Sequence, residues 1–517
     1  MSRRIGWKTL LAVLALAALA AGHLRSGRKA ADASAAGAGI VQTNGVAGFT
    51  LGRLAFAPCE LAQRNTAATT AAFCTLFSVP ENRALPDGRR IDLKVAIVRG
   101  DAEVAARDLV VLLAGGPGQA ATETYPRVAP AFAPLLRHRN VLLIDQRGTG
   151  SSHPLACPAS PTDFDTAAVS EIDTAKVREL TRACLAEVSK SADPAQYTTS
   201  AAVGDLEDVR EALGGPELDL VGVSYGTRVA QQYLKRHPEG VRSVVLDSAV
   251  PNDLVLGSEF AVNLETALKS QFAACTATPD CAKAFGDPYA NLYRLRDALA
   301  AKPVDVTLRD PRTFAATTKP LGALQLAALV RMFAYAPETS ALLPLTISRA
   351  LDGDYAPLAA QAAVLNEELS DLEGSGMQLS VICAEDADRL RERPEDARLI
   401  LGDALVRVMR EQCEIWPHGA RPADFNEPAK SDKPVLVLEG EQDPVTPPRY
   451  GEEIVRNLPN GRLLVAKGQG HSVMGRGCFP RLVARFVETL DAKALDAGCV
   501  ADFGPTPAFI DYNGAGP

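Results

Sequence analysis

Between residues 46 and 251, short apolar runs alternate with stretches of helical periodicity. The runs include "IDLKVAIV", "LVVLLAGG", "NVLLIDQRG", "LDLVGVS" and "VRSVVLDSAV", and most of them are apolar at nearly every position. Continuously apolar strands are typical of a mostly parallel sheet whose two faces are covered by helices. The alternation therefore predicts an α/β fold, and the runs "KPVLVLEGEQD" and "GRLLVAKGQ" extend the sheet after residue 431.

A segment with a different residue pattern separates the two parts of this alternation. Residues 252–430 are mostly helical, as in "LGALQLAALVRMFAY", with little sign of strands. The segment is too long for a structureless connection. We therefore expect one α/β domain, formed by 46–251 and 431–500, that is interrupted by a large helical cap and followed by a C-terminal tail, 501–517.

The N-terminus has the features of an export signal. "MSRRIGWK" is basic, the apolar segment Leu10–Ala21 is short for a membrane span, and Ala18-Leu19-Ala20 is a small-x-small cleavage site. We predict a signal peptide over 1–20 and an Ala/Gly/Ser-rich tether over 21–45, so that no stable membrane span remains after export to the periplasm or the medium. An uncleaved anchor is the alternative, and the export route, general secretory or twin-arginine, is open.

All ten cysteines follow the predicted cleavage site, and an even number in an exported chain indicates disulfides. Pairing between neighbours in the sequence closes the shortest loops, at the lowest entropic cost. The predicted pairs are Cys59–Cys74, Cys157–Cys184, Cys275–Cys281, Cys383–Cys413 and Cys478–Cys499. Zinc is the rival interpretation, but Cys-x-x-Cys is missing and no histidine lies close to a cysteine pair, so we predict no metal and no other cofactor.

The charged residues are mixed along the chain. There are 54 basic and 62 acidic residues, a net charge of −8, and no basic block. Nucleic-acid-binding proteins need a positively charged surface, so a nucleic acid partner is not expected and a small or neutral ligand fits better. The oligomeric state does not follow from the sequence.

The stretch "LDLVGVSYGTRVAQQYL" places Ser224 between Gly222 and Gly226, after an apolar strand and before a helix. A serine hydroxyl becomes an effective nucleophile when a base takes its proton and an oxyanion is stabilised nearby. A sharp strand-to-helix turn provides such a position. Ser224 is the predicted nucleophile, and a serine in an ordinary turn is the alternative.

An orienting acid and a base must follow the serine in that order if the chain has the α/β-hydrolase arrangement. Asp443 follows "PVLVLEGEQ" in a proline-rich loop, and His471 follows "RLLVAKGQG" among glycines. These residues are the predicted acid and base. The alternatives are Glu441 or Asp247 for the acid and His153 for the base.

The stretch "VVLLAGGPGQ" places Gly115 and Gly116 directly after a strand. We predict that the N–H groups of Gly116 and Tyr225 form an oxyanion hole, which acyl transfer requires. A generic Gly-Pro turn is the alternative.

Together, "GGPG", "DQRGTGSS", "GVSYGTRVA", "GEQDPVTP" and "GQGHSV" resemble the secreted α/β-hydrolase peptidases related to tripeptidyl aminopeptidase, whose C-terminal part is the TAP-like domain, and more distantly the prolyl aminopeptidases. The resemblance covers most of residues 55–500. It implies an α/β-hydrolase fold and a serine exopeptidase with Ser224, Asp443 and His471 as its triad. One departure is Ala114, where related enzymes often have histidine, and this leaves the fine specificity open.

An exopeptidase also has to recognise the free α-ammonium of its substrate, and carboxylates of the cap suit this task. The stretch "VICAEDADR" offers Glu385 and Asp386, and Glu385 resembles an acidic position in these peptidases, two residues after a cysteine. A solvated acidic turn is the alternative. The expected partner is a peptide substrate, whereas a carboxylesterase or lipase with the same triad and a non-catalytic binding protein are the alternative functions.

Overall fold

The computed structural model of the protein describes residues 48–63, 66–101, 107–157, 173–309, 313–363 and 375–515. The predicted signal peptide, 1–20, and tether, 21–45, lie outside the described residues. Among the helices that are described, none is both long enough and apolar enough to cross a lipid bilayer.

Six neighbouring strands are parallel and form the centre of a large sheet. In spatial order they are β6 (Asn140–Ile144), β5 (Leu109–Leu113), β7 (Leu218–Val223), β8 (Val241–Asp247), β11 (Val435–Gly440) and β12 (Gly461–Ala466). The central strands are buried almost throughout, and β11 is buried at every position. The predicted α/β fold with a mostly parallel sheet is confirmed.

Four antiparallel strands complete the ten-stranded sheet. They are β1 (Phe49–Leu51), β2 (Leu54–Ala62), β3 (Thr69–Pro80) and β4 (Arg90–Val98), in the order β1-β2-β3-β4-β6. The apolar pattern predicted only β4 among them. Because β2 and β3 are rich in alanine or threonine and partly exposed along their length, they lack the continuous apolar runs of the central strands.

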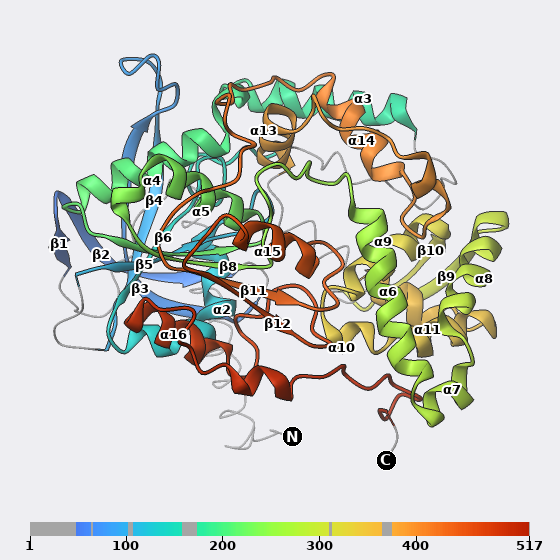
Figure 1. Cartoon of the computed structure of the whole chain (residues 1–517). Coiled ribbons are helices and arrows are strands. Elements are labelled where there is room, and N and C mark those ends of the chain that lie inside the picture. The colour runs from blue at the N-terminus through green and yellow to red at the C-terminus, as the bar shows by residue number, and fades with distance from the viewer. Residues whose placement is uncertain are drawn as a thin grey trace, which may run out of the picture. The chain divides into compact units, whose positions relative to one another are not determined.

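Helices cover both faces of the sheet (Figure 1). On one face lie α2 (Ala121–Leu136) and α16 (Phe479–Thr489), and on the other lie α4 (Thr199–Ala212), α5 (Tyr225–Arg236) and α15 (Pro448–Val455). Each layer packs on its own cluster of buried apolar side chains, because alternate strand residues point to opposite faces. The carboxyl ends of the parallel strands meet at one edge, where the loops after β7, β8, β11 and β12 lie.

The insertion between β8 and β11 has two parts. The first has a separate apolar core and contains α6 (Phe260–Thr276), α8 (Pro288–Ala301), α9 (Ala323–Phe333), α11 (Leu343–Leu351) and the antiparallel pair β9 (Val304–Arg309) and β10 (Ala316–Leu321). The second contains α13 (Ser375–Glu385) and α14 (Ala404–Cys413), which join the apolar cluster of the main sheet. Packing thus divides the segment 252–430, which the sequence predicts as a single cap.

Five disulfides use all ten cysteines, and each joins the pair predicted from proximity in the sequence. Cys383–Cys413 links α13 to α14, and Cys478–Cys499 links the start of α16 to the C-terminal segment. That segment continues to the insertion, where the Phe509 N–H donates to the Ala341 carbonyl oxygen at 2.9 Å.

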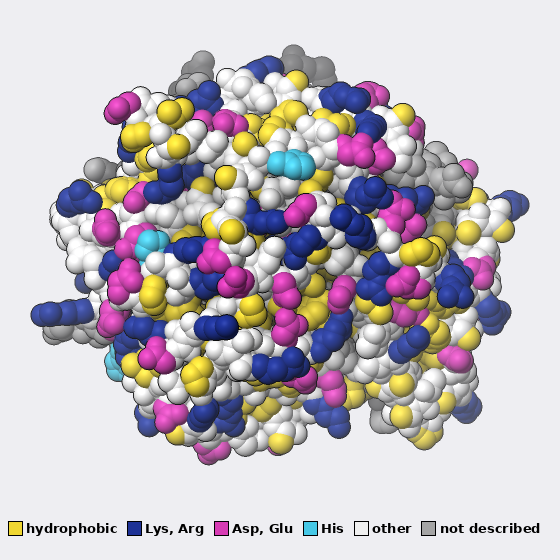
Figure 2. Space-filling view, turned by 45° about the horizontal axis from the view of Figure 1, so that its top comes forward, with side chains coloured by type: hydrophobic (Ala, Val, Ile, Leu, Met, Phe, Trp, Pro, Cys, Tyr) yellow, Lys and Arg dark blue, Asp and Glu magenta, His cyan; other side chains and the backbone are white. Residues whose placement is uncertain are grey.

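Acidic and basic side chains are interspersed over the face of the molecule that Figure 2 shows. The mixed charges of the sequence therefore remain mixed on this part of the folded surface.

Candidate active site

Ser224 lies in a sharp turn between β7 and α5. Its φ of 54° and ψ of −125° place it in a strained region that residues other than glycine rarely adopt. Glycines flank it for steric reasons: a Cβ on Gly222 would lie 2.5 Å from the Gly226 carbonyl oxygen, and one on Gly226 would lie 2.0 Å from the Leu113 carbonyl oxygen. The Ser224 residue itself stays partly exposed.

His471 and Asp443 form a hydrogen-bonded pair at the same edge of the sheet. The His471 Nδ1 lies 2.7 Å from the Asp443 Oδ2. The Asp443 carboxylate is buried and also accepts the N–H groups of Val445 and Thr446, each at 2.8 Å. The His471 side chain keeps 11% of its surface exposed, and an imidazole that is held through Nδ1 exchanges protons through Nε2.

Burial and pairing have opposite effects on the pKa values of this pair. Burial alone would lower the pKa of His471, but the charge of Asp443 and the hydrogen bond between them raise it above its ordinary value. Burial would raise the pKa of Asp443, but the charge and the hydrogen bond of His471 lower it overall. The pair therefore favours the imidazolium–carboxylate form, which arises when a histidine accepts a proton.

Two of the alternative candidates have other partners. The Glu441 carboxylate accepts the Gly468 N–H at 2.8 Å. The His153 Nε2 lies 3.2 Å from the Ser191 carbonyl oxygen. Asp443 is thus the predicted acid that the structure brings to the ring of His471.

Asp247, the third alternative, joins the serine turn to the histidine loop. Its carbonyl oxygen accepts the Ser224 N–H at 2.9 Å. Its carboxylate accepts the N–H groups of Val473 and Met474, at 2.8 and 3.1 Å, which directly follow the histidine segment. Burial raises the pKa of Asp247 to about 6, although both backbone donors oppose the shift. Sequence reasoning considered Asp247 as an acid and missed this positioning contact.

The residues directly after Asp247 form further hydrogen bonds with the histidine loop and with β11. The Ser248 Oγ accepts the Ser472 N–H at 2.8 Å, and the Glu439 Oε1 accepts the Ala249 N–H at 3.0 Å. Burial, with a further contribution from the charge of Asp443, raises the pKa of Glu439 well above its ordinary value. These residues match no motif, and only their positions at the ends of neighbouring strands could have suggested that they meet.

The loop after β5 lies beside Ser224. A Cβ on Gly115 would lie 3.1 Å from the Ser224 Cβ, so this glycine packs directly on the serine. Gly116 is exposed and has a φ of 104°. Tyr225 is the first residue of α5, where backbone N–H groups have no partner within the helix. Both predicted oxyanion donors therefore lie on segments adjacent to the serine.

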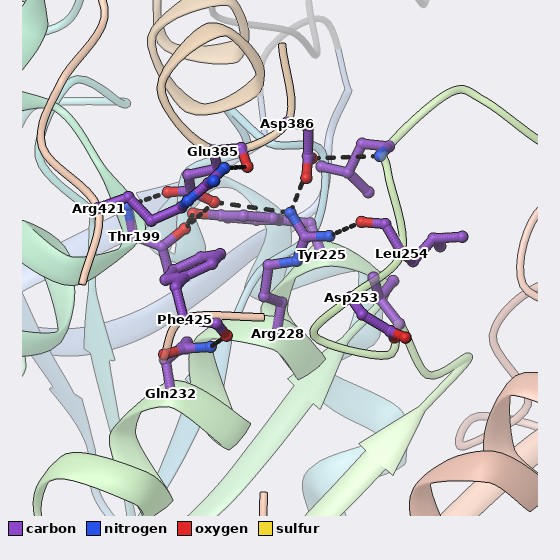
Figure 3. Close-up of polar contacts among 12 residues, drawn as sticks. Thr199, Tyr225, Arg228, Gln232, Asp253, Leu254, Glu385, Asp386, Arg421 and Phe425 are labelled. Atoms are coloured by element: carbon purple, nitrogen blue, oxygen red, sulfur yellow. Dashed lines mark hydrogen bonds and ion pairs between the residues drawn. The ribbon is translucent and has the colours of Figure 1, made fainter. Parts of the chain in front are cut away.

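Glu385 and Asp386, the predicted ammonium-binding residues, lie in a buried cluster with Arg228 (Figure 3). The Arg228 Nη1 is 3.0 Å from an Asp386 oxygen and 3.6 Å from a Glu385 oxygen. All three side chains are at most 1% exposed. Arg228 lies on α5, one turn after Ser224, and the carboxylates come from the end of α13. The Arg228 cluster, as we name these three residues, fastens α13 to the helix that begins at the serine turn.

A hydrogen-bonded chain leads from this cluster to Tyr225. Glu385 accepts the Thr199 N–H at 2.7 Å and the Thr199 hydroxyl at 3.0 Å, and the Thr199 Oγ1 lies 2.6 Å from the Tyr225 hydroxyl. Burial raises the pKa of Glu385 to about 7, with the charge of Arg228 opposing the shift and that of Asp386 adding to it. Recognition of a substrate ammonium by Glu385 or Asp386 stays a prediction.

The insertion also contacts the histidine directly. The His471 N–H donates to the Tyr335 carbonyl oxygen at 2.7 Å. The two rings meet edge to face, with centroids 5.2 Å apart. Tyr335 follows α9, so the first part of the insertion helps to form the surroundings of His471.

Within the described ranges, Glu207, His237 and Glu239 place possible metal ligand atoms within 4.8 Å of one another. The Glu207 carboxylate already accepts hydrogen bonds from Arg210, at 2.7 and 2.8 Å, and from the Tyr233 hydroxyl. A guanidinium therefore supplies the positive charge there, and the group lies at the end of α5 that is distant from Ser224.

Comparison with known proteins gives a family match and several relatives. A family model described as alpha/beta hydrolase fold matches residues 108–475. The chain is 26% identical over 473 residues to serine protease Hip1 of Mycobacterium tuberculosis, and the matched region covers 83% of this chain and 88% of the relative. It is 26% identical over 479 residues to tripeptidyl aminopeptidase of Streptomyces coelicolor, with 84% of each chain covered. It is also 26% identical over 475 residues to carboxylesterase B of Mycobacterium tuberculosis, with coverage of 82% and 85%.

Proposed function

Because the chain belongs to the α/β-hydrolase family, we propose that it is a serine exopeptidase that acts on peptide N-termini through a triad of Ser224, His471 and Asp443. The observation that carries the proposal is the 2.7 Å hydrogen bond between His471 and Asp443. Asp247 supports it, because this residue binds both the serine turn and the histidine loop. The order Ser, Asp, His along the chain is that of α/β hydrolases.

In the acylation step, His471 accepts the hydroxyl proton of Ser224 while the serine Oγ bonds to the carbonyl carbon of the scissile amide. The N–H groups of Gly116 and Tyr225 donate to the oxyanion that forms. His471 then gives its proton to the leaving nitrogen, the C–N bond breaks, and the acyl group remains on Ser224. Asp443 stabilises the imidazolium in this step.

In the deacylation step, a water molecule takes the place of the serine hydroxyl. His471 accepts a proton from the water, whose oxygen bonds to the acyl carbon, and the same backbone donors stabilise the second oxyanion. The proton returns to the Ser224 oxygen as the ester bond breaks. The products are the acyl fragment as a carboxylic acid and the free enzyme.

The choice of peptide over ester rests on the relatives and on the motifs. The two peptidase relatives match the chain as well as the carboxylesterase does, and the motif resemblance favours peptides. A carboxylesterase is the second candidate function, because the same triad cleaves esters and one relative carries that name. A non-catalytic protein of this fold is a remote alternative, since all three triad residues are present.

For the substrate ammonium we propose Glu385 in preference to Asp386. Asp386 has two guanidinium partners, Arg228 at 3.0 Å and Arg389 at 2.7 Å. Glu385 lies farther from Arg228, at 3.6 Å, and is linked through Thr199 to the residue after the nucleophile. Because Glu385 is 1% exposed, an ammonium must displace one of its present partners to reach it.

We propose that the protein is exported. Five disulfides that use every cysteine are typical of proteins from oxidising compartments. The predicted signal peptide, 1–20, agrees with this location.

Matched substrates test the exopeptidase proposal. Peptides with a free N-terminus should be cleaved much faster than their acetylated forms, because acetylation removes the charge that pairs with Glu385, and a charge-assisted hydrogen bond contributes about 1.5–3 kcal/mol. Glu385→Gln, which leaves Asp386 in place as the counter-ion of Arg228, should slow only the free-amine peptides. The neighbouring variant Asp388→Asn, which removes an exposed carboxylate, serves as the control.

Each outcome separates the candidates. Equal cleavage of free and acetylated peptides, or turnover of short-chain esters alone, contradicts the exopeptidase and favours the carboxylesterase. A preference for the free amine that survives Glu385→Gln would leave the function in place and exclude Glu385.

A further inference from the structure

Arg331 lies on α9 of the insertion, one helical turn before Tyr335. Its Nη2 is 3.3 Å from the Tyr335 hydroxyl, and its guanidinium lies over the Phe260 ring, 4.6 Å from the centroid. Tyr335 in turn contacts His471 through its carbonyl oxygen and its ring. The insertion therefore holds a guanidinium close to the proposed catalytic base.

Arg331 differs from other arginines of this region in its partners. Arg449 is paired with Glu259, and Arg476 with Glu338. In the part of the chain that the structure describes, no carboxylate forms an ion pair with Arg331. Its guanidinium contacts the Tyr335 hydroxyl and the rings of Phe260 and Tyr335. It is only partly exposed, and the planar fork of donors of a guanidinium matches a carboxylate.

The position of this charge is unfavourable for the proposed chemistry when the site is empty. The positive charge of Arg331 lowers the pKa of His471, against the larger effects of Asp443 and Asp247, which raise it. His471 carries a proton in both halves of the proposed reaction, so a neighbouring cation without a counter-ion disfavours that state. An anion bound to the guanidinium removes this penalty, which points to a substrate that brings a negative charge.

We propose that Arg331 is a specificity-determining residue that binds a carboxylate of the substrate beside His471. The inference rests on the proposed function, because it assigns the carboxylate to a peptide held at Ser224. The carboxylate has two possible sources. One is the C-terminal carboxylate of a short peptide, which belongs to the leaving portion, and the other is an aspartate or glutamate side chain next to the scissile bond.

Two pairs of substrates distinguish these sources. In the first pair, one short peptide ends in a free carboxylate and the other in a carboxamide. In the second pair, both peptides end in a carboxamide and carry either glutamate or glutamine beside the scissile bond. We expect the acidic member of one pair to have a kcat/KM about tenfold or more above that of its neutral partner, as for a charge-assisted hydrogen bond. The pair that shows the difference identifies the source.

Arg331→Gln should abolish that preference by slowing only the acidic substrate. Arg331→Met keeps an apolar stem over Phe260 and provides a second variant if the first folds poorly. Arg349→Gln is a matched control in the same insertion, because Arg349 lies over the Tyr512 ring and is distant in sequence from the His471 contacts. The control should keep the full preference.

An aminoacyl or peptidyl anilide that carries no carboxylate separates this inference from the proposed function. Its turnover should not fall in either Arg331 variant, and it should be lost in Ser224→Ala. The inference is overturned if wild-type enzyme shows no preference in either pair, if the preference survives Arg331→Gln, or if both Arg331 variants slow acidic and neutral substrates alike. In the first two cases, continued anilide turnover would leave the proposed triad in place.

Discussion

Two groups of charged side chains flank the start of α5, and they differ in exposure. The His471–Asp443 pair lies on the loops after β12 and β11, and His471 keeps 11% of its side-chain surface exposed. The Arg228 cluster lies between α5 and α13, and none of its side chains is more than 1% exposed. A fully buried ion pair fastens elements to each other, whereas a pair with one accessible member can exchange a proton with a substrate.

A shifted pKa alone does not distinguish these two roles. Burial raises the pKa of Glu385 to about 7 and that of Asp247 to about 6, and neither carboxylate bonds to the ring of His471. The distinguishing features are exposure and the connection to the serine turn. By these features the His471–Asp443 pair is suited to proton transfer. The Arg228 cluster fastens α13 to α5, and Glu385 can meet a substrate ammonium only by giving up one of its present partners.

The largest expected effect belongs to the proposed nucleophile, Ser224. Ser224→Ala should reduce kcat/KM by about 10⁴-fold or more, because it removes the atom that forms the acyl-enzyme. The flanking glycines enforce the turn, so the melting temperature should stay close to that of wild type. Activity within tenfold of wild type, measured on correctly folded protein, contradicts the assignment.

The next effect is on stability and concerns the Arg228 cluster. Arg228→Met leaves two buried carboxylates without their shared cation and should lower the free energy of unfolding by about 3–5 kcal/mol. Arg236→Met, on the same helix, breaks a pair that is 35% and 40% exposed, and should cost less than about 1 kcal/mol. Denaturant unfolding of both variants makes the comparison, and equal losses would show that the cluster does not fasten α13.

A smaller effect is expected for the residue that joins the serine turn to the histidine loop. Asp247→Asn keeps one acceptor oxygen and loses the other, so His471 should be less well held and kcat should fall by about 10- to 100-fold, with little change in KM. The negative charge of Asp247 also raises the pKa of His471, so the acid limb of the rate profile should move to lower pH. A loss of stability with unchanged kcat and unchanged pH profile would reduce Asp247 to a structural residue.

The smallest effect is a shift of the pH profile. The proposed base acts when it is neutral, so kcat/KM should fall as the pH drops through the pKa of His471, which lies above the ordinary value of 6.5. Asp443→Asn removes the charge that raises this pKa, and the residual activity should have its acid limb at lower pH. The same imidazole stabilises the fold while it is protonated, and this contribution is lost as the pH rises through its folded pKa. An acid limb at the same pH in both proteins would contradict the pairing.

The residues that the sequence predicted share one property. Ser224, Asp443 and His471 each follow a largely apolar strand, and the ends of parallel strands meet at one edge of a sheet. Local patterns therefore predicted that the three residues converge. The five disulfides were predictable for a similar reason, because each closes a short loop.

The contacts that the sequence did not predict join distant segments. Nothing near Glu385 indicates that its cation is Arg228, and nothing near Asp247 indicates that it binds the backbone after His471. The helical patterns of α13 and α14 predict an apolar face, but they do not say which core it meets. The sequence did not predict β2 and β3, because both strands are partly exposed. Their residues therefore alternate and include polar ones, and they form no continuous apolar run.

The central claim is that the partly exposed pair activates Ser224. Its most direct test is reaction of the protein with a serine-directed fluorophosphonate, followed by mass mapping of the labelled peptide. We predict one adduct, on Ser224, that forms as activity disappears, and much slower labelling in His471→Ala and Asp443→Asn. The control variant Arg236→Met should be labelled at near-wild-type speed. Labelling of another serine as activity is lost, or labelling of Ser224 at an unchanged rate in His471→Ala, would contradict the account.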